Sequence, residues 1–254
     1  MLTTALALIG VVGLGTMFSL VNYGYSLGRL RFFIRPGRRR TVRVVINTAI
    51  SEAAKITTRR DKQILFGNLE SAFYVVKAWS GFREKSKIVP SLSDDENIDY
   101  GDGHLVILGG TLRGQLGHAF LHKISEYYGL DIRFEEDNED DNFIKVGTNE
   151  FHLNWTEQSR RGLSEDFALV VVCHNPFSLR DQRRAIFVGG FTPLATLFAS
   201  RWVFEMMPKK YPHGILSSLR KRHELAVLHY EAMSGEIMSE QVLLHSSLNR
   251  LGMS

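Results

Sequence analysis

The chain has 254 residues, with 31 Lys and Arg, 27 Asp and Glu and a formal net charge of +4. The excess positive charge lies near the start, because residues 1–43 contain seven arginines and no acid. Residues 44–254 therefore hold 24 basic and 27 acidic groups, a net charge of −3. That balance excludes the broad basic face of a nucleic-acid-binding domain, so we expect no direct binding to DNA or RNA duplexes. The lone cysteine, Cys173, excludes an internal disulfide and fits a reducing compartment.

An uncharged run extends from Leu2 to Gly24, and arginines follow it at Arg29, Arg31, Arg35, Arg38, Arg39, Arg40 and Arg43. A helix of about 20 apolar residues spans the hydrocarbon core of a bilayer, and positive charge after a span stays on the cytoplasmic side. We therefore expect residues 1–27 to be a transmembrane helix. This places the protein in the cell inner membrane as a single-pass protein with its N-terminus outside and its C-terminal domain in the cytoplasm. The alternatives are a buried core helix and a cleaved signal peptide, although the basic n-region of a signal peptide is missing.

Residues 28–61 are interpreted as a basic juxtamembrane segment followed by a linker helix over 44–60. We expect Arg35, Arg38, Arg39 and Arg40 to contact anionic headgroups, each worth about 1 kcal/mol near the surface. The same arginines can equally be a topology signal alone. Gly15 and Ser19 form one small-xxx-small pair, which favours helix packing and a homo-oligomer.

The segment over 62–67 is a short apolar run that ends in Gly67, and the helical spacing of apolar residues over 68–82 predicts a helix with Asn68 as its N-cap. The acidic stretch 91–103 predicts a solvated loop. It leads into an apolar strand over 104–110 and a helix over 111–129. Alternating residues over 131–137 and 142–155 predict strands of a hairpin around Gly147.

Residues 166–177 give the strongest strand pattern of the chain, ending at Asn175 and Pro176. A second apolar strand over 183–190 runs into a glycine pair. The following helix over 191–206 has Thr192 as N-cap and Pro193 at its first position. Residues 224–245 favour a terminal hairpin over a helix. Strands alternating with helices predict a Rossmann-like α/β domain over 62–254, with a mostly parallel sheet and flanking helices.

Glycine turns at the ends of the expected strands are the best candidates for a ligand site. Glycine lets a backbone approach a ligand closely, and a helix N-terminus attracts phosphate. With Asn175 expected at the same edge, the predicted ligand-binding residues are Gly67, Asn68, Gly109, Gly110, Thr111, Asn175, Gly189, Gly190, Phe191 and Thr192. Neither turn is a dinucleotide fingerprint or a Walker loop. The alternative is that each glycine only closes a tight turn and each threonine only caps a helix.

No catalytic constellation emerges from the sequence, and we expect no cofactor and no metal site. His118 and His122 lie four residues apart on one helix but lack a third ligand, so a surface or core role is favoured. Cys173 and His174 point to opposite faces of a strand and cannot act as a pair, so Cys173 is expected in the core.

The strands HLVILGGT (104–111) and AIFVGGFT (185–192), behind a single span and an arginine-rich joint, resemble the layout of membrane-anchored effectors of prokaryotic antiviral defence. In these proteins a nucleotide-sensing domain of the CRISPR-associated Rossmann-fold type binds a nucleotide signal. The resemblance implies a membrane-anchored sensor that binds a nucleotide-like molecule, self-associates and relays the signal to its transmembrane helix. The alternatives are an inner-membrane enzyme acting on a nucleotide or nucleotide-sugar, and a protein-binding membrane scaffold with no small-molecule ligand.

Overall fold

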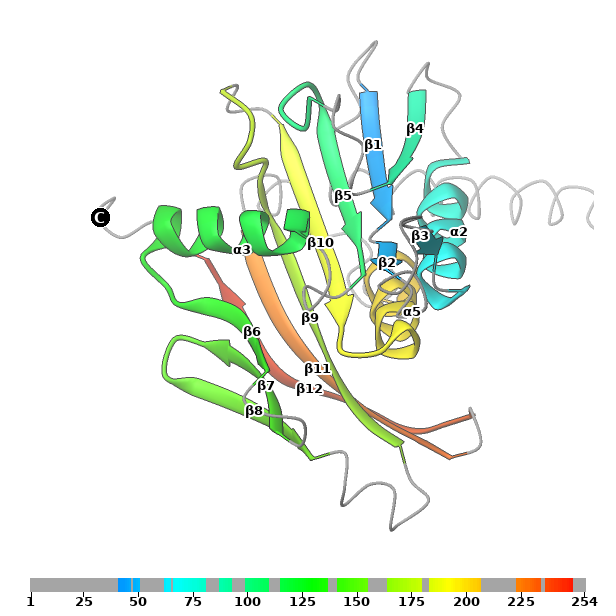
Figure 1. Ribbon diagram of the computed structural model, residues 1–254, viewed down its shortest axis with the longest axis vertical. Coiled ribbons are helices and arrows are strands. Elements are labelled where there is room, and N and C mark those ends of the chain that lie inside the picture. The colour runs from blue at the N-terminus through cyan, green and yellow to red at the C-terminus, as the bar shows by residue number, and fades with distance from the viewer. Residues whose placement is uncertain are drawn as a thin grey trace, which may run out of the picture.

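The computed structural model describes residues 41–46, 48–50, 62–64, 66–80, 87–92, 99–109, 115–136, 141–154, 164–179, 183–206, 223–233 and 236–248. Within them, a seven-stranded main sheet has the order β12-β11-β9-β10-β5-β1-β4 (Figure 1). Its strands, in sheet order, are β12 (Glu236–Ser247), β11 (Glu224–Met233), β9 (Ser164–His174), β10 (Arg184–Gly190), β5 (His104–Leu108), β1 (Thr41–Ile46) and β4 (Lys87–Leu92). Two small sheets are also present, formed by β2 (Thr48–Ile50) with β3 (Lys62–Ile64) and by β6 (Ile132–Glu136), β7 (Asp141–Val146) and β8 (Asn149–Asn154).

The main sheet has a parallel half and an antiparallel half. β4, β1, β5 and β10 run parallel to one another, whereas β9 runs antiparallel to β10 and to β11, and β12 returns antiparallel to β11. The two halves therefore meet between β9 and β10. At one and the same edge of the sheet, β5 and β10 end while β9 begins.

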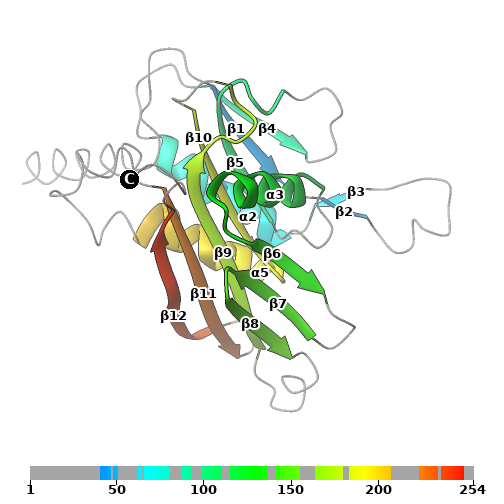
Figure 2. The same cartoon turned by 90° about the vertical axis from the view of Figure 1, so that its left-hand side faces the viewer.

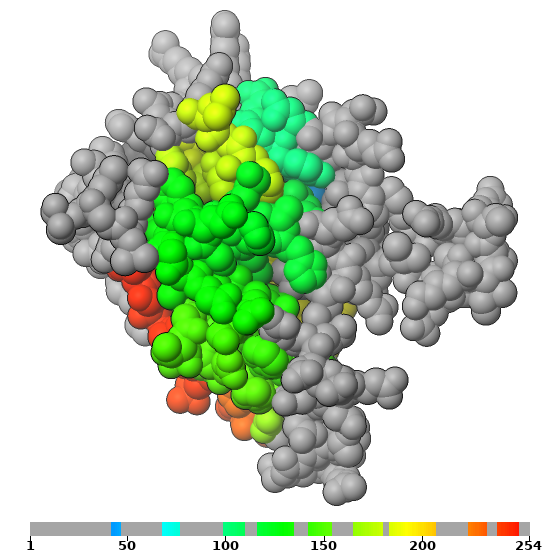
Figure 3. Space-filling view, turned by 60° about the vertical axis from the view of Figure 1, so that its left-hand side comes forward, coloured from blue at the N-terminus to red at the C-terminus, as the bar shows by residue number. Residues whose placement is uncertain are grey.

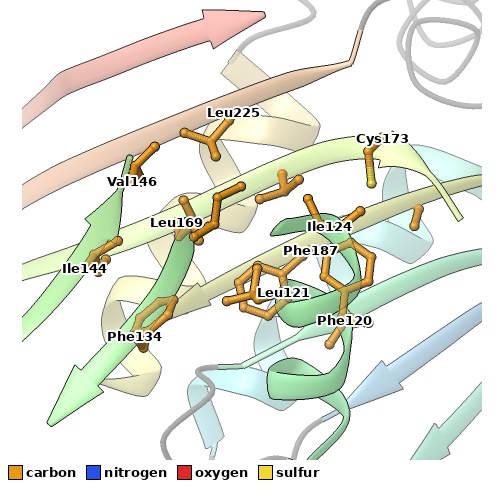
Figure 4. Close-up of a cluster of buried hydrophobic side chains, with 14 of the residues drawn as sticks. Phe120, Leu121, Ile124, Phe134, Ile144, Val146, Leu169, Cys173, Phe187 and Leu225 are labelled. Carbon is orange, nitrogen blue, oxygen red and sulfur yellow. The ribbon is translucent and has the colours of Figure 1, made fainter. Parts of the chain in front are cut away.

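Each face of the main sheet is covered by its own layer. Behind it lie α2 (Phe66–Ser80) and α5 (Pro193–Arg201), with α5 continuing as a π-helical turn η2 (Trp202–Met206). In front lie α3 (Gln115–Tyr128) and the β6–β8 sheet (Figure 2). Two apolar clusters fill these interfaces. The one in front joins Phe120 of α3, Phe134 and Ile144 of the small sheet, and Leu169 and Phe187 of the main sheet (Figure 4).

The expected Rossmann-like fold is wrong. The described chain is rich in strands, with three α-helices and one π-helical turn against twelve strands, and the main sheet is mixed. The error has a physical cause in β9. An antiparallel strand buried on both faces carries the same unbroken apolar run as a parallel one, so Phe167–Cys173 gave no sign of its direction.

Two strands of the parallel half were not expected at all. Residues 41–46 form β1 in the middle of that half, with Val42, Val44 and Val45 buried on alternating faces. The expected linker helix over 44–60 is therefore wrong at its start, because β1 and β2 occupy 44–46 and 48–50. β4 contains Pro90, which a strand tolerates because β4 lies at the sheet edge.

Most of the other expected elements are confirmed. α2, β5, α3, β10 and α5 lie close to where the patterns predict them, Thr192 is the N-cap of α5, and β11 and β12 form the terminal hairpin. The expected N-cap Asn68 is wrong, because α2 already begins at Phe66 and Asn68 lies inside its first turn. Gly147 turns between β7 and β8 with a φ of 61°. Cys173 is fully buried, as predicted.

The described helices contradict the expected single-pass inner-membrane location. Among the residues that the structure describes, no helix is both long enough and apolar enough to cross a bilayer. The run 2–24 and the arginines Arg35, Arg38, Arg39 and Arg40 lie outside the described residues.

Candidate functional site

The two glycine turns predicted from the sequence lie next to each other in the fold. Gly109, which follows β5, donates its backbone N–H to the Val188 carbonyl of β10 at 2.9 Å. A Cβ on Gly189 would lie 2.6 Å from the Gly109 oxygen, so the two backbones are in contact. Gly109 has a φ of 114°, a conformation that glycine alone adopts readily. Gly110 and Thr111 lie outside the described residues.

The turn after β10 allows helix α5 to pack closely against the main sheet. A Cβ on Gly190 would lie 2.4 Å from the Cβ of Ala195 and 3.0 Å from the Phe167 oxygen, so the glycine allows α5 to sit against β10 and β9. The Thr192 side chain accepts a hydrogen bond from the Ala195 N–H at 3.3 Å, and Pro193 begins the helix. Both features serve the start of α5.

Asp166 of β9 already occupies the N-terminus of α5. Its Oδ2 accepts hydrogen bonds from the backbone N–H of Thr192 at 3.0 Å and from the Thr192 hydroxyl, and its Oδ1 accepts from the Phe167 N–H at 2.7 Å. Burial raises the pKa of this carboxyl to about 7, and the hydrogen bonds from Thr192 and Phe167 oppose the rise. The place where a phosphate would bind at α5 is therefore taken by the protein's own carboxylate.

The β5 side of the same edge is different, because the connections diverge there. β1 is followed through α2 by β4 on one side, while β5 pairs with the other side of β1 and is followed by α3. α2 packs behind the sheet and α3 in front. In open α/β sheets such a switch point is where ligands bind, outside the carboxyl ends of the strands. Gly67 and the buried Asn68 lie in the first turn of α2, and neither α2 nor α3 has an acid in its first turn.

A surface recess of about 620 Å³ lies beside α3 and β6, on the face shown in Figure 3. We call it the α3–β6 recess, and its lining residues are His118, Ala119, Leu121, His122, Ser125, Asp131, Ile132, Arg133 and Phe134. Its wall reaches the carboxyl edge of the main sheet, because the Phe134 ring packs against Phe191, just after β10, at 5.2 Å. The recess therefore reaches the carboxyl end of β10, which neighbours β5 in the sheet.

The exposed side chains that line the recess are mostly polar. The imidazole of His122 lies 3.6 Å from Glu126, and Arg133 lies 3.3 Å from Asp131. Ser125 joins the two walls, since its hydroxyl accepts from the Ile132 N–H at 3.0 Å and donates to the Ile132 carbonyl at 3.1 Å. His118 and His122 are exposed, which places both on the surface rather than in the core, the two alternatives that the sequence left open.

Asn175 does not belong to this edge. Because β9 is antiparallel to β10, its end lies at the opposite edge of the sheet from Gly190 and Thr192. The Asn175 side chain donates to the carbonyls of Tyr100 at 2.8 Å and Gly103 at 3.1 Å and accepts from the Phe177 N–H at 3.1 Å. All of its contacts hold loops together.

The opposite edge also carries a buried polar cluster. The Tyr128 hydroxyl is hydrogen-bonded to Nδ1 of His223, and the His223 ring stacks on His174 at 5.7 Å. Burial, with help from Arg184 and His174, lowers the pKa of His223 to about 4. Burial likewise raises the pKa of Tyr128. Both side chains are therefore neutral at pH 7 and tie α3 to the start of β11.

No protein-family model matches the chain, and no curated protein matches it. The function is therefore inferred from the turns and the recess.

Sequence reasoning missed Asp166 and the recess for different reasons. Asp166 sits among the polar residues that begin β9, where a solvated acid is the ordinary expectation. The recess needs α3 and β6 to be placed side by side, and no local spacing encodes that contact. The exposed His118 and His122 on one helix face were its only signal.

Proposed function

We propose that the protein binds a nucleotide-like ligand at the carboxyl edge of the parallel strands and acts as a sensor of that ligand. The phosphates would lie at the β5 turn, near Gly109, Gly110 and Thr111, and the base in the α3–β6 recess. The observation that carries the proposal is the position of the recess, where Phe134 packs on Phe191 at the carboxyl end of β10, the neighbour of β5.

The chemistry of the recess supports a base in two ways. The exposed imidazoles of His118 and His122 can stack on a base, and the exposed Arg133 can donate to its edge. Stacking on an aromatic ring is worth about 1–3 kcal/mol per base. A phosphate is better placed at β5 than at β10, because Asp166 fills the α5 terminus.

The test is isothermal titration of the full chain with ATP, GTP, CTP, UTP and cyclic dinucleotides, followed by mass spectrometry of the bound ligand. We expect His118→Ala and Arg133→Ala each to weaken binding roughly 5- to 30-fold, the loss of about 1–2 kcal/mol. Matched controls are His152→Ala and Arg201→Ala, whose side chains are each 49% exposed and lie away from the recess. Absence of binding across the panel, or equal loss in the controls, would contradict the proposal. Turnover of a bound nucleotide would favour the enzyme alternative.

The proposed self-association has support at the β12 edge. Among the described strands β12 has a neighbour on one side only, runs for 12 residues without proline, and exposes Met238, Val242 and Leu243. A long open strand edge of this kind can pair with a second copy, whereas β4 at the other edge is short and carries Pro90. We expect wild-type protein to form dimers in sedimentation equilibrium and Val242→Lys to be monomeric. An unchanged mass would rule out this edge.

A further inference from the structure

Three side chains with metal-binding atoms meet on the front face of the antiparallel half. Glu165 of β9 lies directly opposite Glu231 of β11 in the register, and His229 lies two residues before Glu231 on the same face. One donor atom from each of the three lies within 4.8 Å of the other two, and all three residues are half-buried. This cluster is separate from the α3–β6 recess.

The two carboxylates repel each other. Like charges directly opposite on paired strands are destabilising, and partial burial strengthens the repulsion. Among the residues that the structure describes, no Lys or Arg forms an ion pair with Glu165 or Glu231. A cation between the two carboxylates would remove this cost.

The surroundings hold two of the three side chains in place. The Ser239 hydroxyl donates to Oε2 of Glu231 at 2.8 Å. The Phe167 ring packs on the His229 ring, with 5.0 Å between centroids. Partners of this kind orient metal ligands and raise affinity. Glu165, on a flexible side chain, is left to complete the set.

We propose that Glu165, His229 and Glu231 form a binding site for a divalent first-row transition cation of the Zn²⁺ type. One imidazole nitrogen and two carboxylate oxygens suit zinc, whereas Mg²⁺ and Ca²⁺ require six or more oxygen ligands. Ligand atoms of a tetrahedral zinc lie about 3.4 Å apart, so donors that lie within 4.8 Å of one another need to move closer by at most about 1.4 Å through side-chain rotation. A water molecule would fill the fourth position, and the ion would join β9 to β11.

The test is competition between the chelator-treated full chain and a fluorescent zinc indicator, without nucleotide, so that the result is independent of the proposed function. We expect one zinc per chain, and at least 10-fold weaker binding in Glu165→Gln and His229→Gln. The matched control is His245→Gln. It removes the contact of His245 on β12 with Glu224 on β11, whose side chains lie 3.3 Å apart. Unchanged affinity in both ligand variants, or equal loss in the control, would overturn the proposal.

A second measurement guards against misfolding of a variant. Without metal, Glu165→Gln should raise the melting temperature because it removes the repulsion, and with zinc it should melt below the wild type. Zinc K-edge absorption of the wild type should show nitrogen and oxygen neighbours only. A sulfur neighbour, or a Glu165→Gln melting temperature that falls without metal, would contradict the site.

Discussion

The two glycine turns at the carboxyl edge look alike in sequence and differ in the fold. Each follows an apolar strand and precedes a threonine and a helix. At β10 the glycines make room for α5, and Asp166 holds the helix terminus. At β5, Gly109 ends a strand at the switch point, and no acid lies in the first turn of α3. The comparison teaches that a glycine pair before a helix can serve close packing alone, as it does at β10, where a residue of the neighbouring strand holds the helix terminus.

The largest expected effect is at Gly190, and it revises the simple idea that both turns bind a ligand. Gly190→Val should lower the free energy of unfolding by at least about 3 kcal/mol, because its Cβ would lie 2.4 Å from that of Ala195. Urea denaturation of the full chain measures this loss. Gly110→Val is the partner variant, expected to fold and to lose nucleotide binding. Equal free energies of unfolding of the two variants would contradict the proposed difference between the two turns.

The next effect concerns the carboxylate that fills the α5 terminus. The folded-state pKa of Asp166 is about 7, above the ordinary value of 3.8, so the folded protein binds more protons between these pH values. Its contribution to stability is therefore fully present below about pH 4 and is lost as the pH rises through 7, on the order of 4 kcal/mol in total.

His223 acts in the opposite direction, because its lowered pKa makes stability fall as the pH drops from 6.5 through about 4. The comparison must therefore be made between variants. The stability difference between wild type and Asp166→Asn should change by about 3–4 kcal/mol between pH 4 and 8. A difference that is flat with pH would show that Asp166 keeps an ordinary pKa.

The smallest effect separates the two threonines. Thr192→Ala removes the N-cap of α5 and should cost about 1 kcal/mol of stability without changing nucleotide affinity. Thr111→Ala should show the reverse pattern, with weaker binding at nearly unchanged stability. Thermal melts and titration of the two proteins side by side provide the measurement. Weaker nucleotide binding by Thr192→Ala would show instead that the β10 turn is part of the ligand site.

The elements with a clear period were predictable from the sequence, and strand direction was not. Thr192 and Pro193 marked the start of α5, and the alternation from Leu225 to His229 marked β11. The direction of β9 is set by its neighbours rather than by its own residues, and this error placed Asn175 at the wrong edge. β1 was hidden because its valines follow a cluster of arginines that indicated a membrane surface.

The candidate site was predictable only in part. The glycine pairs predicted that the two turns share one edge of the sheet, and Gly109 and Gly189 do meet there. The choice between them depends on Asp166, which comes from a third strand. The Glu165, His229 and Glu231 cluster likewise needs the pairing of β9 with β11, although the spacing of His229 and Glu231 already places both on one face.

The pairing of β5 with β10 also means that β5 is synthesised well before its neighbour in the sheet. The contact from the Arg184 N–H to Nδ1 of His104 joins residues 80 positions apart. A ribosome adding roughly 5–20 residues per second makes that stretch in about 4–16 s. Throughout this interval β5 is complete and its β10 neighbour does not yet exist. The apolar centre of the sheet is therefore open during synthesis, and this is the period in which a chaperone would act on the protein.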